Sequence, residues 1–226
     1  MKTLIAVPSM DHVPALFAQS LAMLQKVGEC AVSFEIGSLV YMARDNLAKT
    51  ALKLEADYVF WLDSDMLFNP DILAHMLRTA EENNLDILTG LYFRRSEPFT
   101  PVIFEKVETT ETGCSVSEFA KIPDQLFEVA AAGFGCLLMK TEVLMDVAGR
   151  FGAMFEPMQQ MGEDVSFCWR ARQCGYKIFC DPSQPLGHVG TAIYTRLHYE
   201  ALKQRGEDGN SISESKARPT YNDGAI

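Results

Sequence analysis

The chain has 226 residues, of which 48% are hydrophobic and 22% are charged, and its formal net charge is -10. This length and composition are typical of one globular domain that buries a core. The negative charge excludes a general affinity for phosphate backbones, since Arg94-Arg95 is the only adjacent basic pair, and we expect no nucleic-acid partner.

The chain shows no sign of a membrane span or an export signal. The first apolar run, residues 3–7, ends at Pro8, and no later apolar segment approaches the roughly 20 residues that a span requires. The six cysteines never form a C-x-x-C pair, which favours free thiols over a zinc or disulfide framework. We therefore expect a cytoplasmic protein.

In the first half, strand-like and helix-like segments alternate. Strands are expected over residues 3–7, 30–36, 58–62 and 86–89, and helices over residues 14–28, 38–54 and 69–83. This alternation predicts a mostly parallel sheet with helices on its faces, and ligands in such sheets bind beyond the carboxyl ends of the strands. Residues 7–9, 37–38 and 63–65 all follow strands, so we expect them to line one cleft.

The second half is less regular. Residues 98–108 are expected to form a strand or a loop crossing, and the polar residues 109–117 a hairpin tip. A strand at 136–139, helices at 141–147 and 162–174, and a strand at 176–180 follow. The fold class is therefore α/β, with a mostly parallel central sheet flanked by helices and a smaller mixed β region in the second half. We expect one domain over residues 1–205 and a flexible tail over residues 206–226, which is rich in small and polar residues.

The segment Asp63-Ser64-Asp65 directly follows a continuous apolar strand. Two carboxylates at this range raise each other's pKa unless a cation neutralises them. Oxygen ligands suit Mg²⁺ and Mn²⁺, which bind one or two protein carboxylates together with substrate phosphate oxygens. The alternative is a pair of aspartates that cap or solvate a turn.

Four motifs together resemble a known enzyme family. They are residues 60–66 (Phe-Trp-Leu-Asp-Ser-Asp-Met), Gly133-Phe134-Gly135, Gly162-Glu163-Asp164 and Gly187-His188. In this order and spacing they resemble the GT-A-fold glycosyltransferases, whose sheet is Rossmann-like, and among them the family 2-like bacterial and phage members. The resemblance covers roughly residues 3–190.

The resemblance implies a metal site and a nucleotide-sugar site. It implies manganese or magnesium as the cofactor, with Asp65 and His188 as ligands and Asp63 on the ion or the ribose. Nucleotide and sugar contacts are implied for Val7, Pro8, Ser9, Arg44, Asn46, Asp63, Ser64, Gly133 and Gly135. Structural alternatives stay open: a surface arginine for Arg44, a tight turn for the two glycines, and a structural or surface residue for His188.

Glu163 and Asp164 open a predicted helix. Acidic side chains are stabilised at a helix N-terminus, so both residues are candidates for a simple cap. In the resemblance this pair supplies the base that takes the proton of the acceptor hydroxyl, and Asp164 is the first choice. In the resemblance a base at this position implies inversion at the anomeric carbon, but related GT-A families with a similar D-x-D retain the configuration, so retention stays open.

The predicted function is transfer of a sugar from a UDP- or GDP-linked donor to a hydroxyl group of a carbohydrate or another acceptor. A nucleotidyltransferase that makes nucleotide sugars is the first rival, but residues 8–12 contain neither the glycine nor the lysine of a triphosphate-binding loop. The second rival is a nucleotide-sugar-binding protein without turnover. The sequence leaves open whether the chain forms a homo-oligomer.

Overall fold

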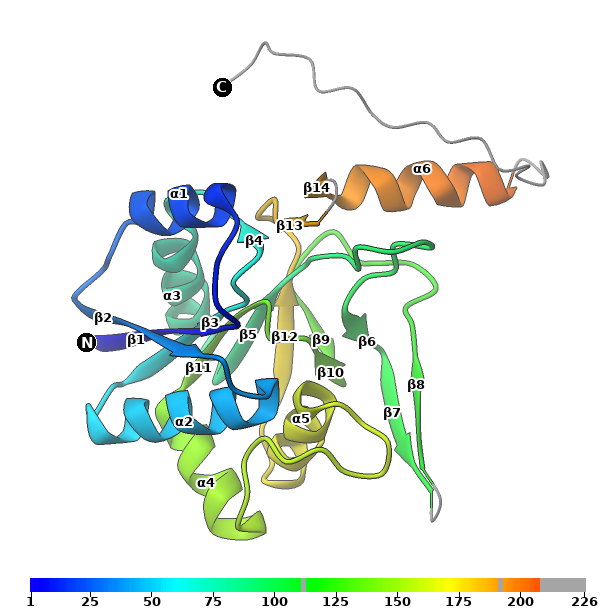
Figure 1. The fold of residues 1–226 in the computed structure, drawn as a ribbon. Coiled ribbons are helices and arrows are strands. Elements are labelled where there is room, and N and C mark those ends of the chain that lie inside the picture. Colours follow the sequence, from blue (N-terminus) through cyan, green and yellow to red (C-terminus); the bar gives the residue numbers. More distant parts are fainter. Residues whose placement is uncertain (111–112, 191–192, 208–226) are drawn as a thin grey trace.

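The computed structural model describes residues 1–110, 113–190 and 193–207, and Figure 1 shows a central sheet covered by helices on both faces. The sheet has 7 strands in the order β2-β1-β3-β11-β5-β12-β9. Its strands are β1 (Lys2–Ser9), β2 (Glu29–Ile36), β3 (Tyr58–Leu62), β5 (Ile87–Gly90), β9 (Phe127–Val129), β11 (Cys136–Lys140) and β12 (Ile178–Asp181).

The sheet is mixed, which corrects the prediction of a mostly parallel, Rossmann-like sheet. β1 pairs in parallel with β2 and β3, and β5 pairs in parallel with β12. β11 is antiparallel to both β3 and β5, and β9 is antiparallel to β12. Local periodicity identifies a strand but not its neighbours, so the insertion of β11 between β3 and β5 could not be seen in the sequence.

Two hydrophobic cores lie on opposite faces of the sheet because successive strand side chains point to opposite sides. Ile5 and Val7 pack with residues of α1 and α3, whereas Leu4 and Ala6 pack with residues of α2, α4 and α5. The helices are α1 (Ala15–Met23), α2 (Val40–Lys53), α3 (Ile72–Glu82), α4 (Thr141–Phe151), α5 (Glu163–Gln173) and α6 (Arg196–Glu207).

Three smaller sheets account for the irregular part of the chain. One has the order β14-β13-β4, and the others pair β10 with β6 and β7 with β8, all antiparallel. Their strands are β4 (Met66–Leu67), β6 (Ile103–Phe104), β7 (Lys106–Thr109), β8 (Cys114–Ser117), β10 (Ala131–Ala132), β13 (Gly187–Val189) and β14 (Ile193–Tyr194). The pairing of β13 with β4 sets His188 opposite Met66, the residue that follows Asp65.

The predicted tail begins inside the last helix. Residues 206 and 207 belong to α6, and residues 208–226 lie outside the described part of the chain. Within the described ranges, no helix combines the length and the apolar character that a membrane crossing requires.

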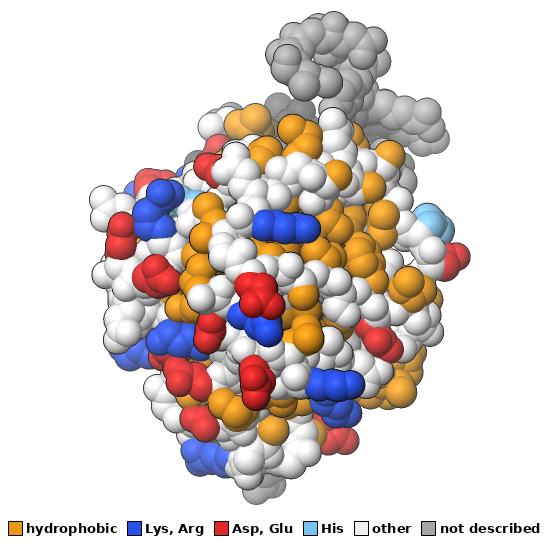
Figure 2. Space-filling model, turned by 90° about the vertical axis from the view of Figure 1, so that its left-hand side faces the viewer, with side chains coloured by type: hydrophobic (Ala, Val, Ile, Leu, Met, Phe, Trp, Pro, Cys, Tyr) orange, Lys and Arg blue, Asp and Glu red, His pale blue; other side chains and the backbone are white. Residues whose placement is uncertain are grey.

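One face of the molecule carries hydrophobic side chains at its surface. Figure 2 shows them gathered among scattered charges on the side that lies to the left in Figure 1. The edge strand β2 exposes Val32, Phe34 and Ile36, alternate residues on one side of the strand. An exposed edge strand can pair with another chain, and natural proteins commonly protect such edges. The sequence leaves open whether the chain forms a homo-oligomer, and β2 is an edge at which one could form.

Candidate functional site

A hollow of about 420 Å³ lies beyond the carboxyl ends of β1, β2 and β3. The three strands run in parallel, so the segments that follow them meet at one edge of the sheet. The described lining residues are Pro8, Ser9, Met10, Ser38, Val40, Ala43, Arg44, Asp63, Ser64, Asp65, Arg95, Glu163, Asp164 and His188. The cleft that the sequence predicts at this edge is therefore present.

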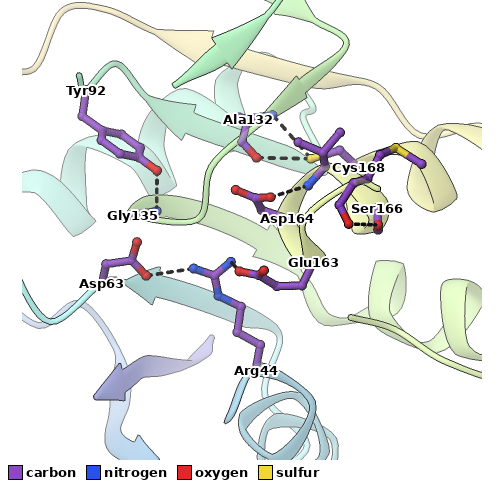
Figure 3. A network of polar contacts seen from close by, with 11 residues as sticks. Arg44, Asp63, Tyr92, Ala132, Gly135, Glu163, Asp164, Ser166 and Cys168 are labelled. Atoms are coloured by element: carbon purple, nitrogen blue, oxygen red, sulfur yellow. Dashed lines mark hydrogen bonds and ion pairs between the residues drawn. The ribbon is translucent and has the colours of Figure 1, made fainter. Parts of the chain in front are cut away.

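Arg44, on α2, organises the buried side of the hollow. Its Nη1 lies 2.8 Å from Glu163 Oε1 and its Nη2 lies 2.9 Å from Asp63 Oδ1, so the guanidinium reaches between the two carboxylates (Figure 3). Its side chain is 4% exposed, and its Cζ lies 5.0 Å from the ring centroid of Phe134. Arg44, Asp63 and Glu163 are called the buried cluster below.

The charges of the buried cluster hold one another in place. Burial by itself lowers the pKa of Arg44, but the carboxylates of Asp63, Glu163 and Asp164 outweigh it and raise that pKa, so the guanidinium stays charged. Burial raises the pKa of Glu163 and of Asp164, and Arg44 opposes this only in part. Asp164 lies at the start of α5, where its Oδ1 accepts a hydrogen bond from the Val165 N–H at 2.7 Å.

Asp65 lies on the exposed side of the hollow between two basic side chains. Its Oδ2 lies 2.7 Å from Arg95 Nη1, and its Oδ1 lies 3.4 Å from His188 Nε2. Burial by itself raises the pKa of Asp65, but the hydrogen bond and charge of His188 and the charge of Arg95 outweigh it and lower the pKa, so the carboxylate is ionised. Asp65, Arg95 and His188 are called the exposed cluster below, after the half-exposed side chain of Arg95, although Asp65 and His188 are only 21% and 13% exposed.

His188 is held in an orientation that suits a metal ligand. Its Nδ1 lies 2.9 Å from the carbonyl oxygen of Phe93, which only accepts, so Nδ1 carries a proton. Nε2 faces Asp65 Oδ1: when it carries a proton it donates to the carboxylate, and without that proton its lone pair could bind a cation. A backbone carbonyl commonly fixes a metal-binding histidine in this way.

The donor set fits a divalent cation held by two protein ligands. Ligand distances of about 2.1 Å put two donors at right angles on one ion about 3 Å apart, close to the separation of Asp65 Oδ1 and His188 Nε2. Phosphate oxygens of a substrate would complete the shell. Within the described residues, no group of three or more His, Cys, Asp or Glu side chains is arranged to hold a metal ion. Asp63 faces Arg44.

Four of the predicted contact residues lie outside the lining. Val7 is fully buried in the core, and Asn46 donates from Nδ2 to Glu35 Oε1 at 2.9 Å. A Cβ on Gly135 would lie 2.7 Å from Tyr92 Cζ, and one on Gly133 would overlap the Tyr92 hydroxyl. The two glycines therefore make room for Tyr92 in this structure.

Neither Arg95 nor Tyr92 was assigned to the site from the sequence. The Gly135 N–H donates to the Tyr92 hydroxyl at 3.1 Å, and the Tyr92 ring packs edge-on against His188 at 5.6 Å. Burial, with the charges of Asp63 and Asp164, raises the pKa of Tyr92 well above its usual value, so the phenol stays protonated. Only their position could have identified them from the sequence, because both residues closely follow the predicted strand at residues 86–89, at the carboxyl edge of the sheet.

Comparisons with known proteins reveal a related fold. No protein-family model and no curated protein sequence matches the chain. The structure is similar to that of A197 from STIV, with a TM-score of 0.61 and 19% identity over 84% of this chain and 86% of that chain. It is also similar to the GT-A glycosyltransferase GalNAc-T7, crystallised with UDP, GalNAc and Mn²⁺, with a TM-score of 0.57 and 11% identity over 90% of this chain. The matched region spans 47% of the GalNAc-T7 chain, and both likenesses concern the fold alone.

Proposed function

We propose that this chain is a metal-dependent glycosyltransferase that moves a sugar from a UDP- or GDP-linked donor to an acceptor hydroxyl, with inversion. One observation carries the proposal. Pro8, Ser9, Arg44, Asp63, Ser64, Asp65, Glu163, Asp164 and His188, which the sequence selects from distant segments, line the same hollow. Its volume of about 420 Å³ lies within the usual range of small-molecule sites.

Asp65 and His188 are the proposed protein ligands of the cation, and Asp63 stays a candidate for the ion or the ribose. When bound, Mn²⁺ or Mg²⁺ would neutralise charge on the departing nucleotide diphosphate. The UDP and Mn²⁺ in the crystal structure of GalNAc-T7, a protein of related fold, are consistent with this chemistry. Pro8, Ser9 and Ser64 contribute the polar and backbone groups on the nucleotide side of the hollow.

Asp164 is the proposed base that accepts the proton of the acceptor hydroxyl. The carboxylate of Glu163 is bonded to Arg44 at 2.8 Å, which leaves Asp164 as the better placed of the two. Burial raises the pKa of Asp164 above its usual value, which makes its carboxylate a stronger base. Glu163 then positions Arg44 and, through it, Asp63.

The proposal also includes the location of the protein, the class of acceptor and the bounds of the catalytic domain. The six cysteines are free in the structure, in keeping with the predicted cytoplasmic location. The acceptor is a carbohydrate or another hydroxyl compound. Residues 1–205 form the proposed catalytic domain.

A panel of nucleotide sugars tests the function. Thermal shift with Mn²⁺ should find a UDP- or GDP-linked sugar that stabilises the wild-type protein, because a bound ligand raises the stability of the folded state. The same donor should release free nucleotide when acceptors are added. Asp65→Asn should lose both responses, whereas Asp71→Asn, which changes an exposed aspartate of the α3 start, should keep them. Release of pyrophosphate from a nucleoside triphosphate and a sugar phosphate would instead indicate a nucleotidyltransferase.

A further inference from the structure

Arg95 makes the closest contact with the proposed metal ligand Asp65. Its Nη1 lies 2.7 Å from Asp65 Oδ2, and its side chain is 50% exposed. Within the described ranges this is the one ion pair of Arg95, and its other contact is a long one, 3.5 Å from Nη1 to the Val189 carbonyl oxygen. In the free protein a guanidinium therefore neutralises the carboxylate that the proposed cation requires.

The contact between Arg95 and Asp65 is easily exchanged. The Arg95 side is 50% exposed and Asp65 is 21% exposed, so water reaches the guanidinium, screens the pair and can solvate the arginine once it leaves. A divalent cation carries twice the charge of a guanidinium and can bind Asp65 together with His188. It therefore displaces Arg95 at little cost.

The displaced side chain has open space beside it. A second hollow of about 450 Å³ is lined by Tyr92, Arg94, Arg95, Ser96, Val102 and His188. It shares Arg95 and His188 with the first hollow, so Arg95 lies where the two meet. A change of its side-chain conformation would leave both hydrophobic cores intact.

The charges of the first hollow give the displaced guanidinium a role. Its described lining contains four carboxylates and two arginines, and Arg44 is already bonded to Asp63 and Glu163. Arg95 is thus the arginine of this lining that becomes free when a cation binds Asp65. A guanidinium offers paired N–H donors that match phosphate oxygens.

We propose that Arg95 neutralises Asp65 in the free protein and moves to the nucleotide diphosphate when a divalent cation takes its place. This inference rests on the proposed function, because it concerns the same metal and the same diphosphate. It makes Arg95 the residue that couples metal binding to nucleotide binding.

The proposal predicts that one substitution of Arg95 raises the affinity for Mn²⁺ and lowers the affinity for UDP. Without nucleotide, Arg95→Gln should bind Mn²⁺ about two- to fivefold more tightly than the wild type, since a competing exposed ion pair is gone. At saturating Mn²⁺ the same variant should bind UDP about tenfold or more weakly, because charge-assisted hydrogen bonds to phosphate are lost. A residue with only a structural role would not strengthen one affinity and weaken the other.

Two binding measurements test this prediction. The loss of the electron paramagnetic resonance signal of free Mn²⁺ gives the metal affinity, and calorimetry gives the UDP affinity. Arg94→Gln is the matched control, since the Arg94 side chain makes no hydrogen bond or ion pair within residues 1–110, 113–190 and 193–207. Arg95→Lys keeps the charge, so it should restore wild-type Mn²⁺ affinity and bind UDP more tightly than Arg95→Gln does. Circular dichroism establishes that each variant is folded.

The outcomes separate this inference from the proposed function. A wild type that binds Mn²⁺ and UDP together, with Arg95→Gln identical to Arg94→Gln, would overturn the role of Arg95 alone. Weaker Mn²⁺ binding by Arg95→Gln would overturn it as well. A wild type that binds neither Mn²⁺ nor UDP would overturn the proposed function, and the role of Arg95 with it.

Discussion

The buried cluster and the exposed cluster lie at the same edge of the sheet but differ in how firmly their charges are held. The side chains of Arg44 and Glu163 are 4% and 14% exposed, and the guanidinium binds two carboxylates at once. Arg95 is 50% exposed and binds one carboxylate. The contrast lies in the two arginines, because Asp63 is 30% exposed and Asp65 is 21% exposed. The same pair of residue types, arginine and aspartate, thus forms a fixed framework in one cluster and an exchangeable contact in the other.

Desolvation explains the difference between the two clusters. Removing one partner of a buried ion pair leaves an uncompensated charge, so the groups of the buried cluster cannot exchange partners cheaply. Water can solvate the half-exposed guanidinium of Arg95 at little cost when it leaves Asp65. The two clusters together give the site a fixed set of charges around Arg44 and an ion pair of Arg95 that a ligand can replace.

The largest difference in effect is expected between substitutions of the neighbouring residues Asp164 and Glu163. Asp164→Asn should lower kcat by about 10²–10⁴-fold, the usual contribution of a general base, and leave the affinity for UDP with Mn²⁺ unchanged. Glu163→Gln should reduce stability more than Asp164→Asn does, because it weakens the bond to Arg44. Steady-state kinetics and thermal melting measure both effects. A greater loss of kcat in Glu163→Gln would reverse the assignment of the base.

Breaking the buried cluster at its centre should have the next largest effect. Arg44→Met leaves Asp63 and Glu163 facing each other without a cation and should lower the free energy of unfolding by about 3–5 kcal/mol. The matched variant Arg95→Met should lose about 1 kcal/mol or less, since its ion pair is exposed. Urea denaturation with unchanged m-values gives both numbers. Equal losses would contradict the distinction between the two clusters.

Tyr92 packs against His188 and accepts a hydrogen bond from Gly135. The carbonyl oxygen of Gly135 in turn accepts from the Asp63 N–H. Gly135→Ala puts a Cβ 2.7 Å from Tyr92 Cζ, so the ring or the backbone must shift. We expect a loss of about 1–3 kcal/mol in the free energy of unfolding, as for an overpacked core. Gly149→Ala is the control, because no heavy atom lies within 4 Å of its added Cβ and its position is helical, where alanine is favoured. A Gly135→Ala protein as stable as the wild type would show that the Tyr92 contact is loose.

The pH dependence of stability should differ in sign between Asp164 and Asp65. Burial raises the pKa of Asp164 above its unfolded value of about 3.9. Between the unfolded and the folded pKa the folded state binds more protons, so it loses stability as the pH rises through this interval. Asp164→Asn should therefore be more stable than the wild type at pH 7, and this difference in the free energy of unfolding should shrink as the pH falls through the folded pKa and vanish below about pH 4.

The pKa of Asp65 is lowered, chiefly because His188 and Arg95 overcome the effect of burial. Its ionised form therefore adds stability above the unfolded pKa of about 3.9, and this contribution is lost as the pH falls through the folded pKa. Asp65→Asn should be less stable than the wild type at pH 7. Chemical denaturation at several pH values gives the free energy of unfolding of Asp164→Asn and Asp65→Asn. A change of the same sign in both variants at pH 7 would contradict the predicted difference between the two residues.

The sequence predicts local structure well and long-range pairing poorly. The predicted strand at residues 58–62 coincides with β3, and the segments after β1, β2 and β3 meet at one edge as expected. The antiparallel β11 was not foreseen to lie between β3 and β5, because apolar runs do not encode which strands become neighbours. The helix predicted to end at Gly28 ends at Met23 instead.

The site shows the same limit. Its carboxylates could be selected because D-x-D and Glu-Asp at a helix start carry recognisable chemistry. The partners of Arg44 lie 19 and 119 residues away along the chain, so their geometry is a product of the fold. Gly133 and Gly135 were assigned to ligand approach because glycine suits close contacts, yet the close contact in the structure is with Tyr92. Arg95 follows its strand without any motif that marks it.

The metal dependence of nucleotide binding tests the central claim most directly. Calorimetry should show that UDP or GDP binds wild-type protein at least about tenfold more tightly with Mn²⁺ than with a chelator, and that Asp65→Asn loses this difference. Equal nucleotide affinity with and without the metal, or an undiminished metal effect in Asp65→Asn, would contradict a cation held at the tip of β3.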